Sequence, residues 1–231
     1  MANTGGLRPK ERCVMKWFCR HWYDFGVIPF LIALAVMIIN WNDLEVIERL
    51  LMMSFIAILV HQFEEYRFPG GEPAIMNIVL QNSDLPDRYP LNQFSAMLTN
   101  VLITYTVYLI PIFLPHVIWL GLMPMLFGIL QFLVHGIATN IKMRSLYNPG
   151  LAAVVFLHFP IGFYYIWYVS SQGMIRGRDW VIAVIYMVLV AGLVVNGLTY
   201  RLLPDRNTKW VFDEVEMRRF HVQERMARLK Q

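Results

Sequence analysis

Charge is scarce in this chain of 231 residues. Asp, Glu, Lys and Arg together account for 16% of the residues, whereas 57% are hydrophobic. A soluble globular domain has about a quarter charged residues. The composition therefore excludes an ordinary soluble domain and indicates an integral membrane protein. Its expected partners are membrane lipid and a lipophilic small-molecule substrate, not nucleic acid.

Cysteines and processing signals are also few. Cys13 and Cys19 do not have the Cys-x2-Cys spacing of a metal-binding pair, and two cysteines do not indicate a disulfide framework. No small-residue cleavage site follows the first apolar run, so we expect a retained first span and not a signal peptide. No internal repeat is visible, although many transporters have one.

Long apolar runs are what the chain does have. Each is close to the ~20 residues that cross the hydrocarbon core of a bilayer. They predict an all-α, polytopic membrane protein, a bundle of six transmembrane helices. The expected spans are roughly 24–40, 47–64, 93–113, 115–136, 150–171 and 179–200. The chain divides into a basic segment 1–23, a transmembrane domain 24–200 and a basic tail 201–231.

Basic residues predict the orientation. Five precede the first span (Arg8, Lys10, Arg12, Lys16 and Arg20), and eight lie from Arg201 onward. Cytoplasmic segments are rich in Lys and Arg, and an even number of spans returns the chain to its starting side. We therefore expect a protein of the inner or plasma membrane with both termini in the cytoplasm. Residues 205–231 are expected to form an amphipathic helix on the membrane surface, with Trp210, Phe212, Val215 and Phe220 on its apolar face.

One stretch at the end of the second span concentrates ionisable groups. His61, Glu64 and Glu65 stand at i, i+3 and i+4 and share one side of a helix, and Pro69-Gly70-Gly71 then ends it. Ionisable residues at membrane depth are candidates for function. The alternative interpretation is a helix end whose polar side chains only reach the lipid headgroups.

The second span is expected to end at the cytoplasmic leaflet, and other polar residues are expected at the same depth in that leaflet. The catalytic candidates are His61, Glu64 and Glu65. The metal-binding candidates are His61, Glu64, Glu65, His135 and His158, and the substrate-binding candidates are Asn100, Asn148 and Arg67. Arg67 has an alternative role, as the partner of Glu64, Glu65 or a headgroup phosphate. Residues 72–92 are too short and too interrupted to span, so we expect a lid or re-entrant turn over the cluster.

The segment from His61 through Glu65 to Gly71 resembles the HXXEE-domain family of small integral membrane proteins. The resemblance continues through Asn100, His135 and the segment Tyr147-Asn148-Pro149-Gly150, over about residues 20–200. It implies a membrane domain but no particular reaction. His61, Glu64 and Glu65 are the motif positions.

The chain is also similar to the glutamate-dependent intramembrane CAAX-type proteases, which pair adjacent glutamates with a downstream histidine. Their motif places an arginine four residues after the second glutamate, where this chain has Pro69. Their His-x3-Asn spacing is also missing, because His135 and Asn140 are one residue too far apart. These departures argue against a protease.

Three classes of function remain open. In the first, the His/Glu cluster binds Zn²⁺ or iron and acts on a lipid-like or isoprenoid-like substrate, as a hydrolase, oxygenase or isomerase. In the second, a membrane isomerase or cyclase uses a protonated glutamate and a histidine as metal-free acid and base. In the third, the cluster is an ion site of a transporter or a polar contact between helices. A homo-oligomer is compatible with each class.

Overall fold

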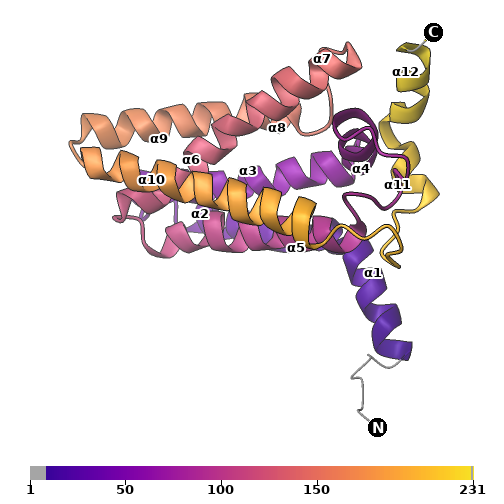
Figure 1. The fold of residues 1–231 in the computed structure, drawn as a ribbon. Coiled ribbons are helices and arrows are strands. Elements are labelled where there is room, and N and C mark those ends of the chain that lie inside the picture. Colours follow the sequence, from indigo (N-terminus) through magenta and orange to yellow (C-terminus); the bar gives the residue numbers. More distant parts are fainter. Residues whose placement is uncertain (1–8, 230) are drawn as a thin grey trace.

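The computed structural model describes residues 9–229 and 231 and shows an all-helical bundle (Figure 1). Residues 1–8 of the predicted N-terminal segment lie outside the described residues, as do the side chains of residues 9–13. Six helical segments in the described part are long and apolar enough to cross a membrane, which confirms the expected fold class. They are Val14–Ile39, Val46–Tyr66, Gln93–Phe113, Ile118–Met143, Leu151–Ser171 and Gly177–Leu202.

The first three spans follow the expected boundaries, except that the first begins earlier. It combines the end of α1 (Pro9–Phe25) with α2 (Val27–Ile39), because Gly26 continues the helical hydrogen bonding by donating to the Trp22 carbonyl. The second span is α3 (Val46–Tyr66), and the third comprises α5 (Gln93–Ile103), η2 (Thr104–Leu109) and η3 (Ile110–Phe113).

The last three spans also contain π-helical segments, as the third does in η2. The fourth comprises α6 (Ile118–Phe132), η4 (Leu133–Thr139) and α7 (Asn140–Met143). The fifth comprises α8 (Leu151–Ala153), η5 (Val154–His158) and α9 (Phe159–Ser171), and the sixth α10 (Gly177–Leu189) and η6 (Val190–Leu202). The fourth span therefore ends at Met143, past the expected residue 136.

Helix α3 occupies the centre of the bundle. Buried side chains lie on all its sides, and it contacts α2, η2, α6, α8 and α9. A helix that is apolar all round is either buried among other helices or spans a membrane. The contacts and buried side chains of α3 place its C-terminal turn, which contains the ionisable motif, inside the protein.

Residues 72–92 form a cap at one end of the bundle and do not span it. The cap begins with α4 (Glu72–Ala74) and η1 (Ile75–Leu80). Asn77 stabilises the loop that follows, because its amide donates to the carbonyls of Pro86 and Leu91 and accepts from the Leu91 amide. This arrangement agrees with the lid expected from the sequence.

The C-terminal tail differs from the expected single surface helix. It contains α11 (Glu214–Arg218), η7 (Arg219–His221) and α12 (Val222–Leu229). The helical conformation is interrupted at Phe220, whose φ is 57°. Phe212 is buried in a cluster with residues of α1 and α5. The expected apolar face is therefore divided: Phe212 packs into the protein, whereas Val215 is exposed.

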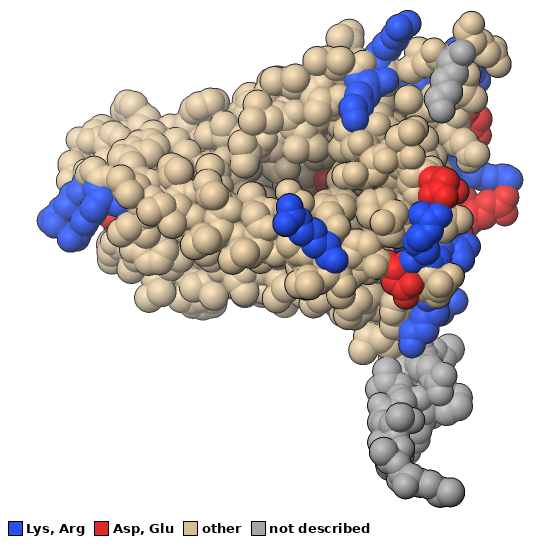
Figure 2. Space-filling view, viewed as in Figure 1, with Lys and Arg blue, Asp and Glu red and all other residues tan. Residues whose placement is uncertain are grey.

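The tail, the cap and α1 lie at the same end of the bundle (Figure 1). Figure 2 shows that charged side chains gather at the two ends of the visible face, whereas the stretch between them is almost uncharged. An uncharged middle with charged ends is the pattern that a bilayer requires. The division into segments 1–23, 24–200 and 201–231 stays a prediction.

A buried carboxyl in the tail predicts a pH effect on stability. Glu216 Oε2 accepts hydrogen bonds from Gln93 Nε2 and from the Asp213 amide, each 2.9 Å long. Burial raises the pKa of Glu216 above its ordinary value, although the bond from Gln93 and nearby arginines oppose the shift. The folded chain therefore binds this proton more tightly than the unfolded chain. The associated stability is complete below the ordinary pKa and is lost as the pH rises through the raised value.

We therefore expect Glu216→Gln, which keeps an oxygen acceptor, to raise the thermal unfolding midpoint at pH 8 and to reduce its change between pH 5 and pH 8. The exposed Glu224 of α12 provides the control, and Glu224→Gln should unfold like the wild type at both pH values. Thermal melts of the three proteins in one detergent test this. Lower stability of Glu216→Gln at pH 8 would contradict it.

Candidate metal centre

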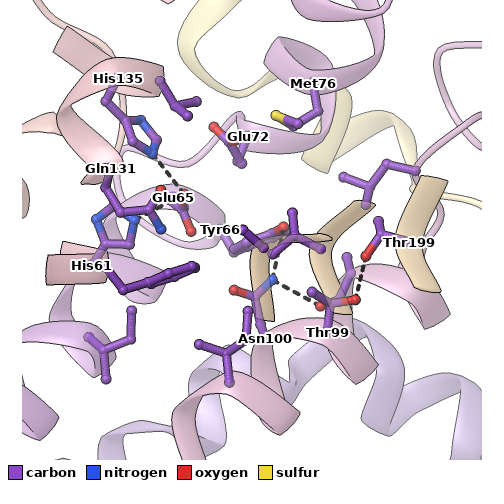
Figure 3. Close-up of a pocket in the computed structure, with 18 of the residues that line it drawn as sticks. His61, Glu65, Tyr66, Glu72, Met76, Thr99, Asn100, Gln131, His135 and Thr199 are labelled. Atoms are coloured by element: carbon purple, nitrogen blue, oxygen red, sulfur yellow. Dashed lines mark hydrogen bonds and ion pairs between the residues drawn. The ribbon is translucent and has the colours of Figure 1, made fainter. Parts of the chain in front are cut away.

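Three side chains from two helices converge at the end of α3. His61 and Glu65 lie one turn apart on α3, and His135 projects from η4 (Figure 3). Glu65 Oε1 lies 3.2 Å from His61 Nε2 and 3.2 Å from His135 Nε2. The potential ligand atoms of the three residues all lie within 4.8 Å of one another. The arrangement brings together residues that are 74 positions apart in the sequence.

The other nitrogen of each imidazole has a defined hydrogen-bond partner. His61 Nδ1 donates to the Gly150 carbonyl over 3.0 Å, and His135 Nδ1 donates to Asn148 Oδ1 over 2.9 Å. The Asn148 amide is oriented by its own donor bonds, to the His135 carbonyl and to Asn140 Oδ1. Metal-binding histidines characteristically donate their second ring N–H to such oxygens.

These bonds leave the Nε2 lone pairs directed at a carboxylate. With a hydrogen on each Nδ1, a neutral imidazole has an unprotonated Nε2, and His61 Nε2 is buried without a hydrogen-bond donor. Two nitrogen lone pairs and a carboxylate oxygen repel one another at 3.2 Å. The three residues are at most 7% exposed, so water does not screen this repulsion. The arrangement therefore requires a cation, either a metal ion or protons.

Gly150 allows the close approach of the two imidazoles. Its φ is +97°, in the left-handed region that favours glycine. A Cβ at this position would lie 2.6 Å from His135 Cε1 and 3.0 Å from His61 Cε1. A side chain at residue 150 would therefore displace both rings.

Glu64 lies outside the group formed by His61, Glu65 and His135. Its carboxylate accepts hydrogen bonds from Tyr147 Oη (2.8 Å) and from the backbone amides of Ala152 (3.1 Å) and Ala153 (2.8 Å). These amides begin α8, where the first N–H groups of a helix have no partner within it. Glu64 thus caps the N-terminal end of α8. Glu64 and Glu65 stand at i+3 and i+4 from His61, and their side chains point to different neighbours of α3.

His158, another expected ligand, lies beside the group but not in it. Its ring packs edge-on against His61 with 5.6 Å between the centroids, and Nε2 is buried without a hydrogen-bond partner. A Cβ at Gly128 of α6 would lie 2.5 Å from His158 Nδ1. The ring therefore occupies space that the glycine leaves free, next to His61.

The three expected substrate-binding residues have different positions. Asn100 lines the cavity beside the cluster and receives a hydrogen bond from Gln62. Asn148 orients His135. Arg67 Nε lies 3.1 Å from Asp24 Oδ1, so Arg67 pairs with Asp24 in the structure and not with Glu64 or Glu65, and its expected role in substrate binding stays a prediction. The chain turns away after Tyr66 and directs Arg67 toward α1.

The cluster opens on a cavity of about 220 Å³. Its residues come from α3, the cap, α5, α6, η4 and η6. They include the gathered residues His61, Glu65 and His135, the polar residues Tyr66, Glu72, Thr99, Asn100, Gln131, Thr199 and Tyr200, and apolar residues such as Ile58, Ile103, Phe127, Val134 and Val195. The centre is thus reached from a space with a polar and an apolar part.

A model of the family described as "Protein of unknown function with HXXEE motif" matches residues 52–165, about half of the chain. His61, Glu64 and Glu65 supply the motif letters. The chain belongs to the HXXEE family. The matched region contains the gathered residues and Asn148, Gly150 and His158, but it is shorter than the resemblance over residues 20–200. No curated protein matches the chain, and no solved structure matches it.

Glu72 is a site residue outside the HXXEE motif that the sequence reasoning missed. It lies on α4 beside Glu65 and His135 (Figure 3), is 5% exposed, and has a buried Oε2 without a hydrogen-bond partner. Burial raises the pKa of Glu72 well above its ordinary value, and the Glu65 carboxylate adds to the shift. The available signal was its position directly after Pro69-Gly70-Gly71.

Proposed function

We propose that this HXXEE protein is a metal-dependent membrane enzyme that acts on a lipophilic substrate. His61 and His135 would bind a divalent ion through Nε2, and Glu65 through its carboxylate. Two imidazoles and one carboxylate form the protein ligands of many catalytic zinc sites and of non-haem iron sites. The observation that supports the proposal is the convergence of two oriented Nε2 lone pairs on one buried carboxylate.

Each surrounding residue has a role in this proposal. A bound Zn²⁺ or Fe²⁺ would polarise a substrate oxygen or activate a water molecule. Gly150 and Asn148 orient the two histidines through their Nδ1 atoms. Glu72 offers its carboxyl group for a hydrogen bond to a polar group in the cavity, since its Oε2 has no partner among the described residues. The apolar residues of the cavity favour a hydrocarbon part of the substrate over water.

A metal-free acid–base enzyme is the second candidate, because protons on the histidines would also relieve the repulsion around Glu65. Metal analysis distinguishes the two. We expect purified protein to hold about one Zn²⁺ or Fe²⁺ per chain and His135→Ala to lose it, because the remaining two ligands belong to one helix turn.

The matched control is His116→Ala, since His116 is exposed and lies near Glu45 at the other end of α3. This variant should keep the full metal content. Folded wild-type protein that remains metal-free after incubation with either ion would contradict the metal proposal. Equal metal contents of His135→Ala and wild type would do the same.

We also infer that both termini lie in the cytoplasm. The support is the even number of candidate spans together with the basic residues before the first span and after the last. Reporter fusions at each terminus should both report the cytoplasm, whereas a reporter inserted at Gly173, between the fifth and sixth spans, should report the opposite side. Opposite signals from the two termini would contradict this topology.

A further inference from the structure

The cavity beside the metal centre opens toward the side of the bundle. Helices α6 and α10 pack against each other, whereas their continuations η4 and η6 diverge (Figure 1). Leu130 and Gln131 of α6 and Val134 of η4 line the cavity from the fourth span. Ala191, Val195 and Thr199 of η6 line it from the sixth span. Figure 2 shows a hollow in the uncharged side of the molecule with an acidic side chain inside it. The centre is therefore accessible from the region that faces lipid.

The size of the cavity limits what it can hold. Its volume of about 220 Å³ is below the ~300–1,000 Å³ of typical small-molecule sites. A complete lipid does not fit, but the polar head of a lipid and the first part of one chain do. The rest of such a chain would leave between η4 and η6 and stay among the lipid chains of the bilayer.

The charge of the residues that line the cavity limits which lipid head group the cavity can bind. Two carboxyl groups, those of Glu65 and Glu72, line the cavity, and among the described residues no Lys or Arg does. A phosphate or carboxylate head would be withdrawn from water beside the Glu65 carboxylate without a basic side chain to pair with, which is costly. A divalent ion at the centre would repel a cationic head. The lining thus favours a head without charge.

Hydrogen-bonding groups at the polar end suit such a head. Gln131 lines the cavity, as do Thr99 of α5 and Thr199 of η6, whose hydroxyls are hydrogen-bonded to each other. Amides and hydroxyls both donate and accept. A hydroxyl or carbonyl group can therefore be bound beside the centre without an ion pair.

From these observations we propose that the substrate is a single-chain lipid with an uncharged hydroxyl or carbonyl head, which enters sideways between η4 and η6. This inference rests on the proposed function, because it assigns a substrate class to the same centre. The head lies between the metal centre and Gln131. The chain passes Val134 and Val195 to the bilayer.

A photoreactive hexadecanol with a diazirine in its chain tests the proposal in protein reconstituted in phosphatidylcholine nanodiscs. We expect labelling of residues in η4 and η6. Unlabelled hexadecanol should displace the probe at concentrations at least about tenfold lower than hexadecanoate or hexadecyl phosphate, because the charged heads are not paired in the cavity. Equal competition by either anion, or labelling confined to other helices, would overturn the proposal.

A pair of variants in η6 tests the route. Val195 lines the cavity, whereas Leu193, two residues earlier, is 67% exposed and does not line it. Val195→Trp should reduce labelling at least about fivefold, and Leu193→Trp should leave it unchanged, since only the first side chain fills the route. Equal labelling of the two variants would refute sideways access.

Metal content, measured on the same samples, separates this inference from the proposed function. Metal binding without preference for the uncharged probe overturns the inference alone. Preferential, sideways labelling of a protein that never binds metal overturns the metal proposal and leaves the substrate class supported.

Discussion

Glutamine at position 65 is expected to remove the metal from the protein, whereas glutamine at position 64 should leave it in place. Glu65 Oε1 lies 3.2 Å from both Nε2 atoms, and Glu64 is engaged with Tyr147 and α8. Loss of an outer partner of a metal ligand costs about 10–100-fold in affinity, so loss of the Glu65 carboxylate, itself a proposed ligand, should cost at least about 100-fold. Elemental analysis after dialysis against a weak chelator measures the difference.

The same two variants should show the reverse order in thermal stability, with Glu64→Gln more destabilised than Glu65→Gln. The Glu64 carboxylate accepts three hydrogen bonds and lies at the N-terminal end of α8, where negative charge is favourable. Glutamine directs an NH₂ group at one of these donors, at a cost of about 1–3 kcal/mol. Glu64→Gln should therefore melt at a lower temperature while it keeps its metal. Loss of metal from Glu64→Gln but not from Glu65→Gln would contradict the assignment.

Alanine at position 150 is expected to disrupt the centre although residue 150 has no ligand atom there. A Cβ would lie 2.6 Å from His135 Cε1 and 3.0 Å from His61 Cε1, so both rings must move. Metal ligands tolerate little displacement from their geometry. We expect metal affinity to fall at least about tenfold, a value anchored on the effect of perturbing the partners of metal ligands. Competition with a metal-binding dye measures the affinity.

Gly173→Ala separates the effect of the steric contact with the histidines from the energetic cost of a left-handed backbone. Gly173 also has a positive φ, +64°, but a Cβ there would have no atom within 4 Å. Both variants carry the cost of a left-handed alanine, about 1–2 kcal/mol, and only Gly150→Ala meets the histidines. Gly173→Ala should thus lose stability and keep the affinity of the wild type. Equal affinities of the two variants would contradict the role of Gly150.

The spans were predictable because membrane spans are defined by hydropathy over about 20 residues. The ends of the spans were less predictable. Four of the six spans contain π-helical segments, which single-sequence periodicity does not reveal. The fourth span therefore continues past His135 to Met143, and α1 joins the first span because Gly26 does not end the helix.

Within the site, sequence spacing placed His61 and Glu65 together but did not separate Glu65 from Glu64. Both lie within one turn of His61, and which of them faces His135 depends on the neighbouring helices. Glu72 was missed because its proximity depends on how the chain turns at Gly70 and Gly71, both of which have positive φ. The break of the tail at Phe220 likewise depends on tertiary contacts.

The contacts of the C-terminal tail have a consequence for the order of assembly. Arg219 donates to the Tyr66 carbonyl, and the Phe220 ring packs edge-on against Tyr147, which bonds Glu64. Ribosomes synthesise the chain from its N-terminus, so His61, Glu65 and His135 are in the membrane before residues 219 and 220 exist. The turns that frame the centre acquire these contacts only after residues 219 and 220 have been synthesised. A nascent chain that stops before Arg219 would therefore have all three ligands but lack the support that Arg219 and Phe220 give to the turns.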